Sequence, residues 1–241
     1  MPTLNENDKV VFCREFTKDV ASTVCLPFSI DATQAAEAGK FYTFAGVDKS
    51  GADWEVIMQE TPTSNLVSGA LTANTPYLFV PAATGPVLFY GEATASSTAG
   101  EVSDTEGWTF KGTYTRIDWL TDPQTIYGFA ATNATNVSPG TFFRVKGGAN
   151  SYILPFRAYL DAANCSSLAP SRMPASEMPS QMTVRLIAAD GTITAIGTLD
   201  THTGEVRFDS DTWYDINGRR LNGQPTTKGV YIHNGRKEVV K

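Results

Sequence analysis

The stretch "TPYLFVPAATGPVLFYGEA", residues 75–93, decides the fold class of this chain. It holds two short runs of aromatic and aliphatic residues, at 77–80 and 87–90, and proline or glycine flanks each run. Aromatic and branched aliphatic residues favour β-strands, and flanking proline and glycine are typical of strand ends. Both runs are therefore predicted to be strands.

The same pattern of short strand-like segments repeats from residue 10 to residue 160. Segments such as "KFYTFAGV", "DWEVIMQE", "GWTFKGTYTRI", "TIYGFA" and "TFFRVKG" alternate with clusters of Gly, Pro, Ser, Thr and Asn. Short strands at regular spacing favour an antiparallel architecture over a parallel α/β sheet. We expect an all-β fold: an antiparallel β-sandwich or jelly roll, followed by a small β-hairpin C-terminal region.

One segment, "DATQAAEAGK" at residues 31–40, is the only helical candidate. Asp31 is expected to cap its N-terminus, because an Asp side chain can accept a hydrogen bond from a free backbone N–H of the first turn. Gly39 is expected to end it. A short helix is therefore predicted between these two residues.

The residue composition changes after residue 163. The stretch "SSLAPSRMPASEMPS" places three prolines among small polar residues, which is typical of a linker. Next, "TVRLIAADGTITAIG" has two alternating segments around Asp190-Gly191, which predicts a hairpin. The predicted organisation is a large β module at 1–163, a Pro/Ser-rich linker at 164–182 and a small β region at 183–241.

The chain closes with "YDINGRRLNGQPTTKGVYIHNGRKEVVK", residues 214–241. A turn at Asn217-Gly218 would place Tyr214 opposite Leu221. A second turn, at Asn234-Gly235, would place Val230 opposite Val239 and Tyr231 opposite Glu238. We therefore expect two hairpins joined by a loop.

Charge and hydropathy exclude some functions. The net charge of −6 gives no reason to expect nucleic-acid binding, which needs basic residues to neutralise phosphates. The residues from Gly218 onward carry +5 and residues 1–217 carry −11, so the tail is a separate unit in composition. No apolar run is long enough to span a membrane. The start, "MPTLNENDKV", has no signal-peptide pattern, so an exported form is expected to have lost one.

Most common catalytic residue sets are missing. Both histidines, His202 and His233, follow the predicted linker, so the large module has no histidine for a catalytic triad or a His-ligated metal. We expect no cofactor and no metal site. Two acid-based alternatives stay open. Glycoside hydrolysis needs only a pair of carboxylates, and its candidates are Asp53, Glu55, Glu92, Asp118 and Asp122. The candidates for a calcium loop are Glu101, Asp104 and Glu106.

Aromatic residues give the best binding candidate. In "RIDWLTDPQ", Trp119 follows a strand and enters an acidic, turn-rich loop. An exposed indole could stack on a sugar while Asp118 or Asp122 bonds its hydroxyl groups. Core packing is the alternative for Trp119, and we expect it for Trp54 and Trp108, which lie in alternating strands.

Two cysteines, Cys13 and Cys25, lie six residues on either side of Asp19. A hairpin turning at Asp19 would place them opposite each other, close enough for a disulfide. The alternative is that Cys25 is a buried free thiol.

The tail motifs "WYDINGRRL", "KGVYIHNGRK" and "VVK" resemble the C-terminal sorting regions of proteins exported by the type IX secretion system of Bacteroidetes bacteria. The residues that match the pattern are Asp215, Gly218, Arg219, Gly229, Tyr231 and Lys241. The resemblance implies a small β unit that the outer-membrane export machinery reads. It also implies an extracellular or outer-membrane surface location.

The larger segment resembles an uncharacterised module of secreted proteins of Prevotella and Bacteroides. The matching motifs, in order, are "STVCLPFSI", "LTANTPYLFV", "WTFKGTYT", "IYGF" and "PFRAYL". We therefore expect a non-enzymatic secreted or cell-surface module that takes part in adhesion or glycan contact. The alternatives are a carboxylate-dependent glycoside hydrolase and a purely structural spacer of a surface assembly.

Overall fold

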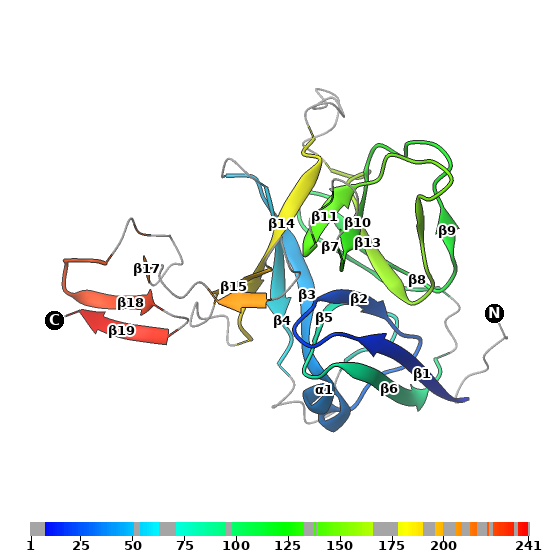
Figure 1. Cartoon of the computed structure of the whole chain (residues 1–241), viewed down its shortest axis with the longest axis horizontal. Coiled ribbons are helices and arrows are strands. Elements are labelled where there is room, and N and C mark those ends of the chain that lie inside the picture. The colour runs from blue at the N-terminus through cyan, green and yellow to red at the C-terminus, as the bar shows by residue number, and fades with distance from the viewer. Residues whose placement is uncertain are drawn as a thin grey trace.

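The computed structural model describes residues 8–50, 54–62, 71–94, 98–132, 137, 139–165, 178–189, 196–199, 206–208, 213–215, 221, 224–233 and 236–240. Strands dominate these residues, and they contain one short helix, α1 (Ala32–Ala38). The predicted all-β fold is confirmed. Figure 1 shows a large curled sheet accompanied by smaller two- and three-stranded sheets.

The large sheet has twelve strands within the described residues. Ten of them, in spatial order, are β2 (Ser22–Cys25), β5 (Pro76–Pro81), β3 (Gly39–Asp48), β4 (Glu55–Glu60), β14 (Gln181–Ile187), β11 (Thr141–Arg144), β10 (Ile126–Ala130), β13 (Arg157–Asp161), β8 (Thr109–Thr113) and β7 (Glu101–Ser103). In addition, β15 (Ile196–Leu199) pairs with β14, and β16 (Val206–Phe208) pairs with β15. Every pairing is antiparallel except that of β4 with β14.

The sheet curls until strands that are not neighbours meet. Although β2 and β13 are far apart in the strand order, the Ala158 N–H donates to the Thr23 hydroxyl oxygen at 3.0 Å. The curl encloses the main core, whose largest fully buried side chains include Trp108, Phe110 and Phe142. Trp54 packs edge-on against Trp108 with ring centroids 6.1 Å apart, so core packing of both tryptophans is confirmed.

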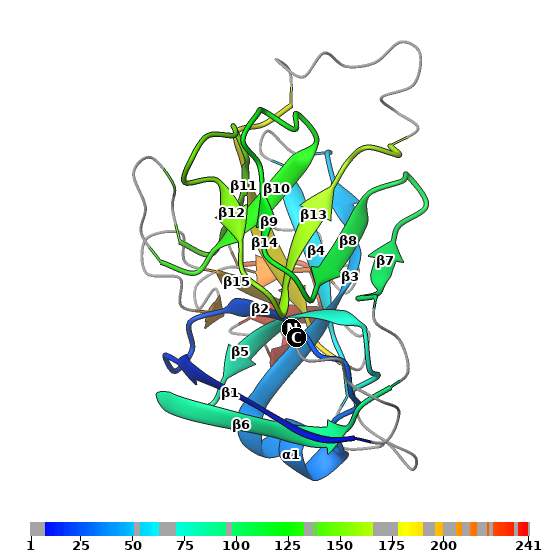
Figure 2. The same ribbon diagram turned by 90° about the vertical axis from the view of Figure 1, so that its right-hand side faces the viewer.

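A second core lies beneath this sheet. Here β1 (Lys9–Phe16) and β6 (Gly85–Glu92) form a two-stranded ribbon, which Figure 2 shows next to α1 at the lower end of the molecule. Phe41 and Phe79 stack at 4.5 Å between the ribbon and the large sheet. Strand β5 separates the two cores, with Leu78 in the main core and Phe79 in the second. All six β5 residues are therefore buried, which explains the unbroken apolar run in the opening stretch.

The predicted helix is confirmed. The Asp31 carboxylate accepts the Gln34 N–H at 2.8 Å, which caps the first turn of α1. Gly39 ends the helix at φ +150°, in the region that favours glycine. A Cβ at Gly39 would lie 2.1 Å from the Val80 carbonyl oxygen, so the close approach of β5 also requires glycine.

The large sheet extends beyond the predicted domain boundary at residue 183. Strand β14 lies between β4 and β11, with Thr183 opposite Glu55 and Phe142 opposite Met182. Val184 is fully buried in the main core. The composition around 164–182 indicated a linker, but the strand that follows it pairs with β4, far away in the sequence, and local patterns carry no signal for such a pairing.

The remaining strands form small sheets. Strands β9 (Ile117–Asp118) and β12 (Tyr152–Ile153) pair with each other. The pairing of β14 with β15 confirms the hairpin expected around Asp190-Gly191, although 190–195 lie outside the described residues.

A three-stranded sheet ends the chain, and Figure 1 shows it beyond β15. Its strands are β17 (Trp213–Tyr214), β18 (Gly229–His233) and β19 (Arg236–Val240). Val230 lies opposite Val239, and Tyr231 opposite Glu238, so the second predicted hairpin is confirmed in register.

Most of the first predicted hairpin of the tail lies outside the described residues. On one edge, β17 pairs with β18, with Tyr214 opposite Ile232. Leu221 also lies beside β17, because its N–H donates to the Trp213 carbonyl oxygen at 2.7 Å, one residue from the predicted partner Tyr214. The predicted turn at 217–218 lies outside the described residues.

The hairpin expected at Asp19 is wrong, and so is the disulfide that depended on it. Strand β1 pairs with β6, which places Cys13 opposite Leu88, and β2 pairs with β5, which places Cys25 opposite Pro76. Cys13 is an exposed free thiol, and Cys25 is a buried free thiol. The proposed alternative for Cys25 is therefore the one that the structure supports.

Candidate functional site

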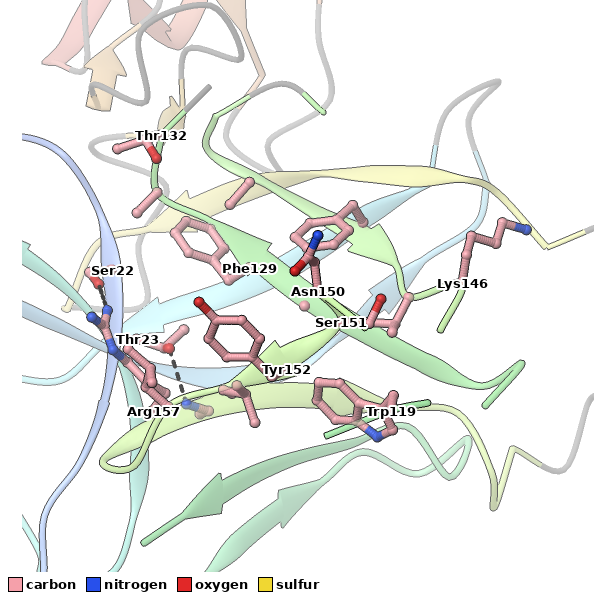
Figure 3. A pocket seen from close by; sticks show the side chains of 18 residues that line it. Ser22, Thr23, Trp119, Phe129, Thr132, Lys146, Asn150, Ser151, Tyr152 and Arg157 are labelled. Carbon is pink, nitrogen blue, oxygen red and sulfur yellow. Dashed lines mark hydrogen bonds between the residues drawn. The ribbon is translucent and has the colours of Figure 1, made fainter. Parts of the chain in front are cut away.

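A cleft of about 530 Å³ opens between the curled sheet and the β9–β12 ribbon. Strands β2, β10, β11 and β13 contribute to its lining, together with the loop before β12. Figure 3 shows the side chains that surround it. The lining residues are Ser22, Thr23, Trp119, Gly128, Phe129, Ala130, Ala131, Thr132, Phe143, Val145, Lys146, Asn150, Ser151, Tyr152, Ile153, Leu154, Arg157 and Ala158.

Trp119 lines this cleft, and its backbone is held on both sides. Its N–H donates to the Ser151 carbonyl oxygen at 2.8 Å, and its own carbonyl oxygen accepts the Gly148 N–H at 2.8 Å. The indole meets the Tyr159 ring edge-on, with centroids 5.6 Å apart. The side chain is only partly buried. A partly exposed indole whose backbone is fixed is suited to contact with a ligand.

Close packing of two loops keeps Trp119 in place. Gly147 has φ +78°, and a Cβ there would lie 2.3 Å from the carbonyl carbon of Thr121. Glycine is needed both for the backbone conformation and for the space. The loop that carries Trp119 and the loop before β12 are therefore fixed against each other before any ligand arrives.

Asp118 does not line the cleft. Its carboxylate binds the Arg116 guanidinium through contacts of 2.7–3.0 Å. These hydrogen bonds hold the pKa of Asp118 below its usual value. Arg116 in turn lies 3.9 Å from the centre of the Tyr152 ring, a cation–π contact. Asp118 thus helps to hold Arg116 over Tyr152, which does line the cleft.

Asp122 does not line the cleft either. Its carboxylate accepts the Gln124 N–H at 2.7 Å, and Gln124 has a positive φ of +63°. This contact is a local turn in which the Asp side chain bonds the backbone two residues on. Of the three residues predicted for sugar binding, the structure places Trp119 in the cleft and both acids outside it.

One end of the cleft is cationic. Arg157 donates through Nη1 to the Ser22 hydroxyl oxygen at 2.8 Å, and the Ala158 N–H donates to Thr23. In Figure 3, Arg157 and Ser22 lie together at one end, with Tyr152 between them and Trp119. Burial lowers the pKa of Arg157 from its usual value.

The chemistry of the lining suits binding. Trp119, Tyr152 and Phe129 supply aromatic surface, and Asn150 and Thr132 supply polar groups. The lining contains no Asp, Glu, His or Cys among its residues in the described part of the chain. A pair of carboxylates of the kind that glycoside hydrolysis uses is therefore not present in this lining.

The other acids predicted as catalytic candidates have separate places. Glu55 on β4 forms an ion pair with Arg185. Glu92 ends β6, opposite Lys9 of β1. Asp53 lies outside the described residues.

The predicted calcium loop is a β-turn region between β7 and β8. The Asp104 carboxylate accepts the N–H groups of Glu106 and Trp108, both at 2.9 Å. Glu106 forms an ion pair with Lys49, and Glu101 is exposed. Within the described residues, no group of three His, Cys, Asp or Glu side chains could hold a metal ion.

Three of the residues predicted for sorting are described. Gly229 and Tyr231 lie on β18, and Asp215 follows β17. The Tyr231 hydroxyl donates to the Thr227 carbonyl oxygen at 2.9 Å, and its ring meets Trp213 edge-on at 6.5 Å. The other three, Gly218, Arg219 and Lys241, lie outside the described residues.

Sequence reasoning missed Tyr152 and Arg157. Arg157 lies in "PFRAYL", which was assigned only to the module pattern. Its partner Ser22 is 135 residues away, so no local pattern joins them. Tyr152 lies in "SYILPFRAYL", whose aromatic and aliphatic residues predict one strand, but β12 ends at Ile153, before Pro155.

Comparisons with known proteins give no relative: no family model, no curated protein and no solved structure matches this chain. Within the part of the chain that the structure describes, no helix has the length and apolar character needed to cross a membrane.

Proposed function

We propose that this chain is a non-enzymatic secreted or cell-surface module that binds a glycan in the cleft beside Trp119. The observation that carries the proposal is the position of Trp119 in the lining of this cleft. The ring faces of sugars present C–H groups, which pack well against the flat apolar surface of an indole. Hydroxyl groups around the sugar then need hydrogen-bonding partners.

The arrangement of the neighbours supports the same ligand class. Tyr152 is 45% exposed and lines the cleft with Phe129, so aromatic surface continues beyond Trp119. Asn150 is exposed in the same lining and offers both a donor and an acceptor. Because the backbone of Trp119 is already fixed by two hydrogen bonds, little ordering cost remains when a ligand binds.

We also propose that the C-terminal segment carries the export signal. Its resemblance to sorting regions of the type IX secretion system supports this, as does a basic composition that differs from the rest of the chain. The predicted partner is then the outer-membrane export machinery, and the predicted location is the cell surface or the medium.

A glycan array tests the binding proposal. The wild-type chain is expected to give reproducible signals for a set of related glycans, and Trp119→Ala is expected to reduce them by about fivefold or more, since stacking contributes of the order of 1 kcal/mol or more. Leu120→Ala is the matched control, because Leu120 is 74% exposed next to Trp119 but does not line the cleft. A blank array with folded wild-type protein would remove the proposal.

A further inference from the structure

We infer that the glycan bound in this cleft is acidic, and that Arg157 receives its anionic group, a carboxylate or a sulfate. The inference deepens the proposed function and rests on it for the saccharide part. The cationic end of the cleft carries it, through the contacts between Ser22, Arg157 and Arg14.

Two arginines share one neutral oxygen. The Ser22 hydroxyl oxygen accepts from Arg14 Nη2 at 2.6 Å and from Arg157 Nη1 at 2.8 Å. A hydroxyl group has two acceptor lone pairs and one donor hydrogen. Because the two arginines use both lone pairs, the Ser22 hydroxyl group can only donate a further hydrogen bond. Ser22, Arg14 and Arg157 together can therefore donate hydrogen bonds to a ligand but can accept few.

Among the described residues, neither arginine has a carboxylate partner. Within the described chain, the ion pairs involve other residues, and neither Arg14 nor Arg157 takes part in one. Cations that are largely removed from water are normally paired with an acid. Burial, and then the charge of Arg157, lowers the pKa of Arg14. A guanidinium stays protonated at neutral pH, so two like charges lie close to each other at this end of the cleft.

The two arginines have different roles. Arg14 also donates to the Thr23 carbonyl oxygen at 3.1 Å and lies 4.0 Å from the centre of the Phe16 ring, and it does not line the cleft. It therefore holds β1 against β2 and adds positive charge. Arg157 lines the cleft, so it is the cation that a ligand can reach.

The charge of the whole lining points the same way. Lys146 and Arg157 are its charged residues, and it has no acid, although the chain as a whole carries −6. A guanidinium offers parallel donors that match the oxygens of a carboxylate or sulfate. Since aromatic surface lines the rest of the cleft, the ligand that uses both parts is a saccharide with an acidic group.

Matched saccharide pairs test this inference by isothermal titration calorimetry. The pairs are trigalacturonate and its methyl ester, 3′-sialyllactose and lactose, and N-acetylglucosamine 6-sulfate and N-acetylglucosamine. In at least one pair the charged member is expected to bind about tenfold more tightly or better, as for a hydrogen bond between charged groups. The pair that responds distinguishes a carboxylate from a sulfate.

Variants of the full chain assign the effect to Arg157. Arg157→Met is expected to reduce the affinity for the charged member to that for the neutral member. Arg157→Lys is expected to retain part of the preference, because lysine keeps the positive charge but lacks the parallel N–H donors of a guanidinium. Lys40→Met is the control, since it removes the same charge from a residue that does not line the cleft. If Arg157→Met does not fold, Arg157→Gln and Arg157→Lys give the same comparison.

The outcomes separate the two proposals. Equal affinity for charged and neutral members, unaffected by Arg157→Met, would overturn the acidic-ligand inference and leave glycan binding in place. If no saccharide binds, the proposed function fails, and thermal melting in sodium sulfate against sodium chloride of equal ionic strength then decides the inference. Greater stabilisation by sulfate in the wild type than in Arg157→Met supports an anion site, and equal stabilisation overturns it.

Discussion

Arg157 on β13 donates a hydrogen bond of 2.8 Å to the hydroxyl group of Ser22 on β2, and this contact joins two strands that are not neighbours in the large sheet. The contact has two consequences. It helps to hold the curled sheet closed over the main core, and it forms the cationic end of the cleft. The same curl that builds the core therefore also builds the candidate site.

Strand β14 should be indispensable to the large sheet. A chain that ends at residue 177 loses Met182, Val184 and Leu186 from the main core and exposes the edges of β4 and β11. Each buried aliphatic side chain contributes about 2–5 kcal/mol, so the loss approaches the whole stability of a domain. Circular dichroism melting should show no cooperative transition for this chain. A chain that ends at residue 212 keeps β14 and should melt cooperatively.

Deletion of Gly229 to Lys241 removes β18 and β19, which pair only with β17 and with each other within the described residues. The melting temperature of the large sheet should therefore change by no more than about 2 °C. In a host with a type IX secretion system, the deleted chain should accumulate in the periplasm. Normal delivery to the surface would contradict the proposed sorting role.

Only one thiol should react in the folded chain. Cys13 is exposed, whereas burial raises the pKa of Cys25 to about 11 and that of Cys165 to about 12. Because the thiolate is the reactive form, a disulfide reagent at pH 8 should modify one thiol in the native chain and three after unfolding. If no thiol reacts in the native chain and only one reacts after unfolding, Cys13 and Cys25 are joined in the disulfide that the sequence analysis considered, and this prediction is wrong.

The raised pKa of Cys25 also predicts alkaline sensitivity. Between pH 9 and pH 11 this thiol is ionised in the unfolded chain but not in the folded chain. The contribution of the protonated thiol to the free energy of unfolding is therefore complete below pH 9 and is lost as the pH rises through about 11. In urea titrations, Cys25→Ser should reduce the fall in unfolding free energy by up to about 1.4 kcal/mol per pH unit in this window. If the unfolding free energies of the wild type and of Cys25→Ser fall equally with pH, ionisation of Cys25 is not the cause of the alkaline sensitivity.

Gly147→Ala should damage the site through the backbone. The added Cβ would meet the Thr121 carbonyl carbon at 2.3 Å, so the loop that holds Trp119 must move, with a cost of about 1–3 kcal/mol. Gly148→Ala is the matched control: φ is also positive, at +118°, but no atom lies within 4 Å of the added Cβ. Glycan affinity should fall more in Gly147→Ala than in Gly148→Ala, and an equal loss would disprove the role of the close contact.

Local patterns in the sequence predicted the local features well. The α1 cap at Asp31, the Val230–Val239 register and the core positions of Trp54 and Trp108 each depend on a few neighbouring residues. Trp119 could be predicted as well, because a large aromatic residue in a polar, turn-rich loop has little core to enter.

The predictions that were wrong concern segments whose pairing partners are far away in the sequence. The spacing of Cys13 and Cys25 around Asp19 is compatible with a local hairpin, but β1 pairs with β6 and β2 with β5. Likewise, the proline-rich stretch before β14 resembled a boundary between domains, although β14 returns to pair with β4. The acids beside Trp119 bind local groups instead of the cleft, since Asp118 has Arg116 two residues away.

The most direct test of glycan binding at Trp119 is the NMR signal of its indole N–H. The chain has four tryptophans, so ¹⁵N-labelled protein gives four indole signals, and Trp119→Phe assigns the relevant one. On titration with the saccharide that gives the strongest array signal, the Trp119 indole signal should shift in a saturable way while that of the buried Trp108 stays in place. Saturable binding that leaves the Trp119 signal unmoved would contradict the account.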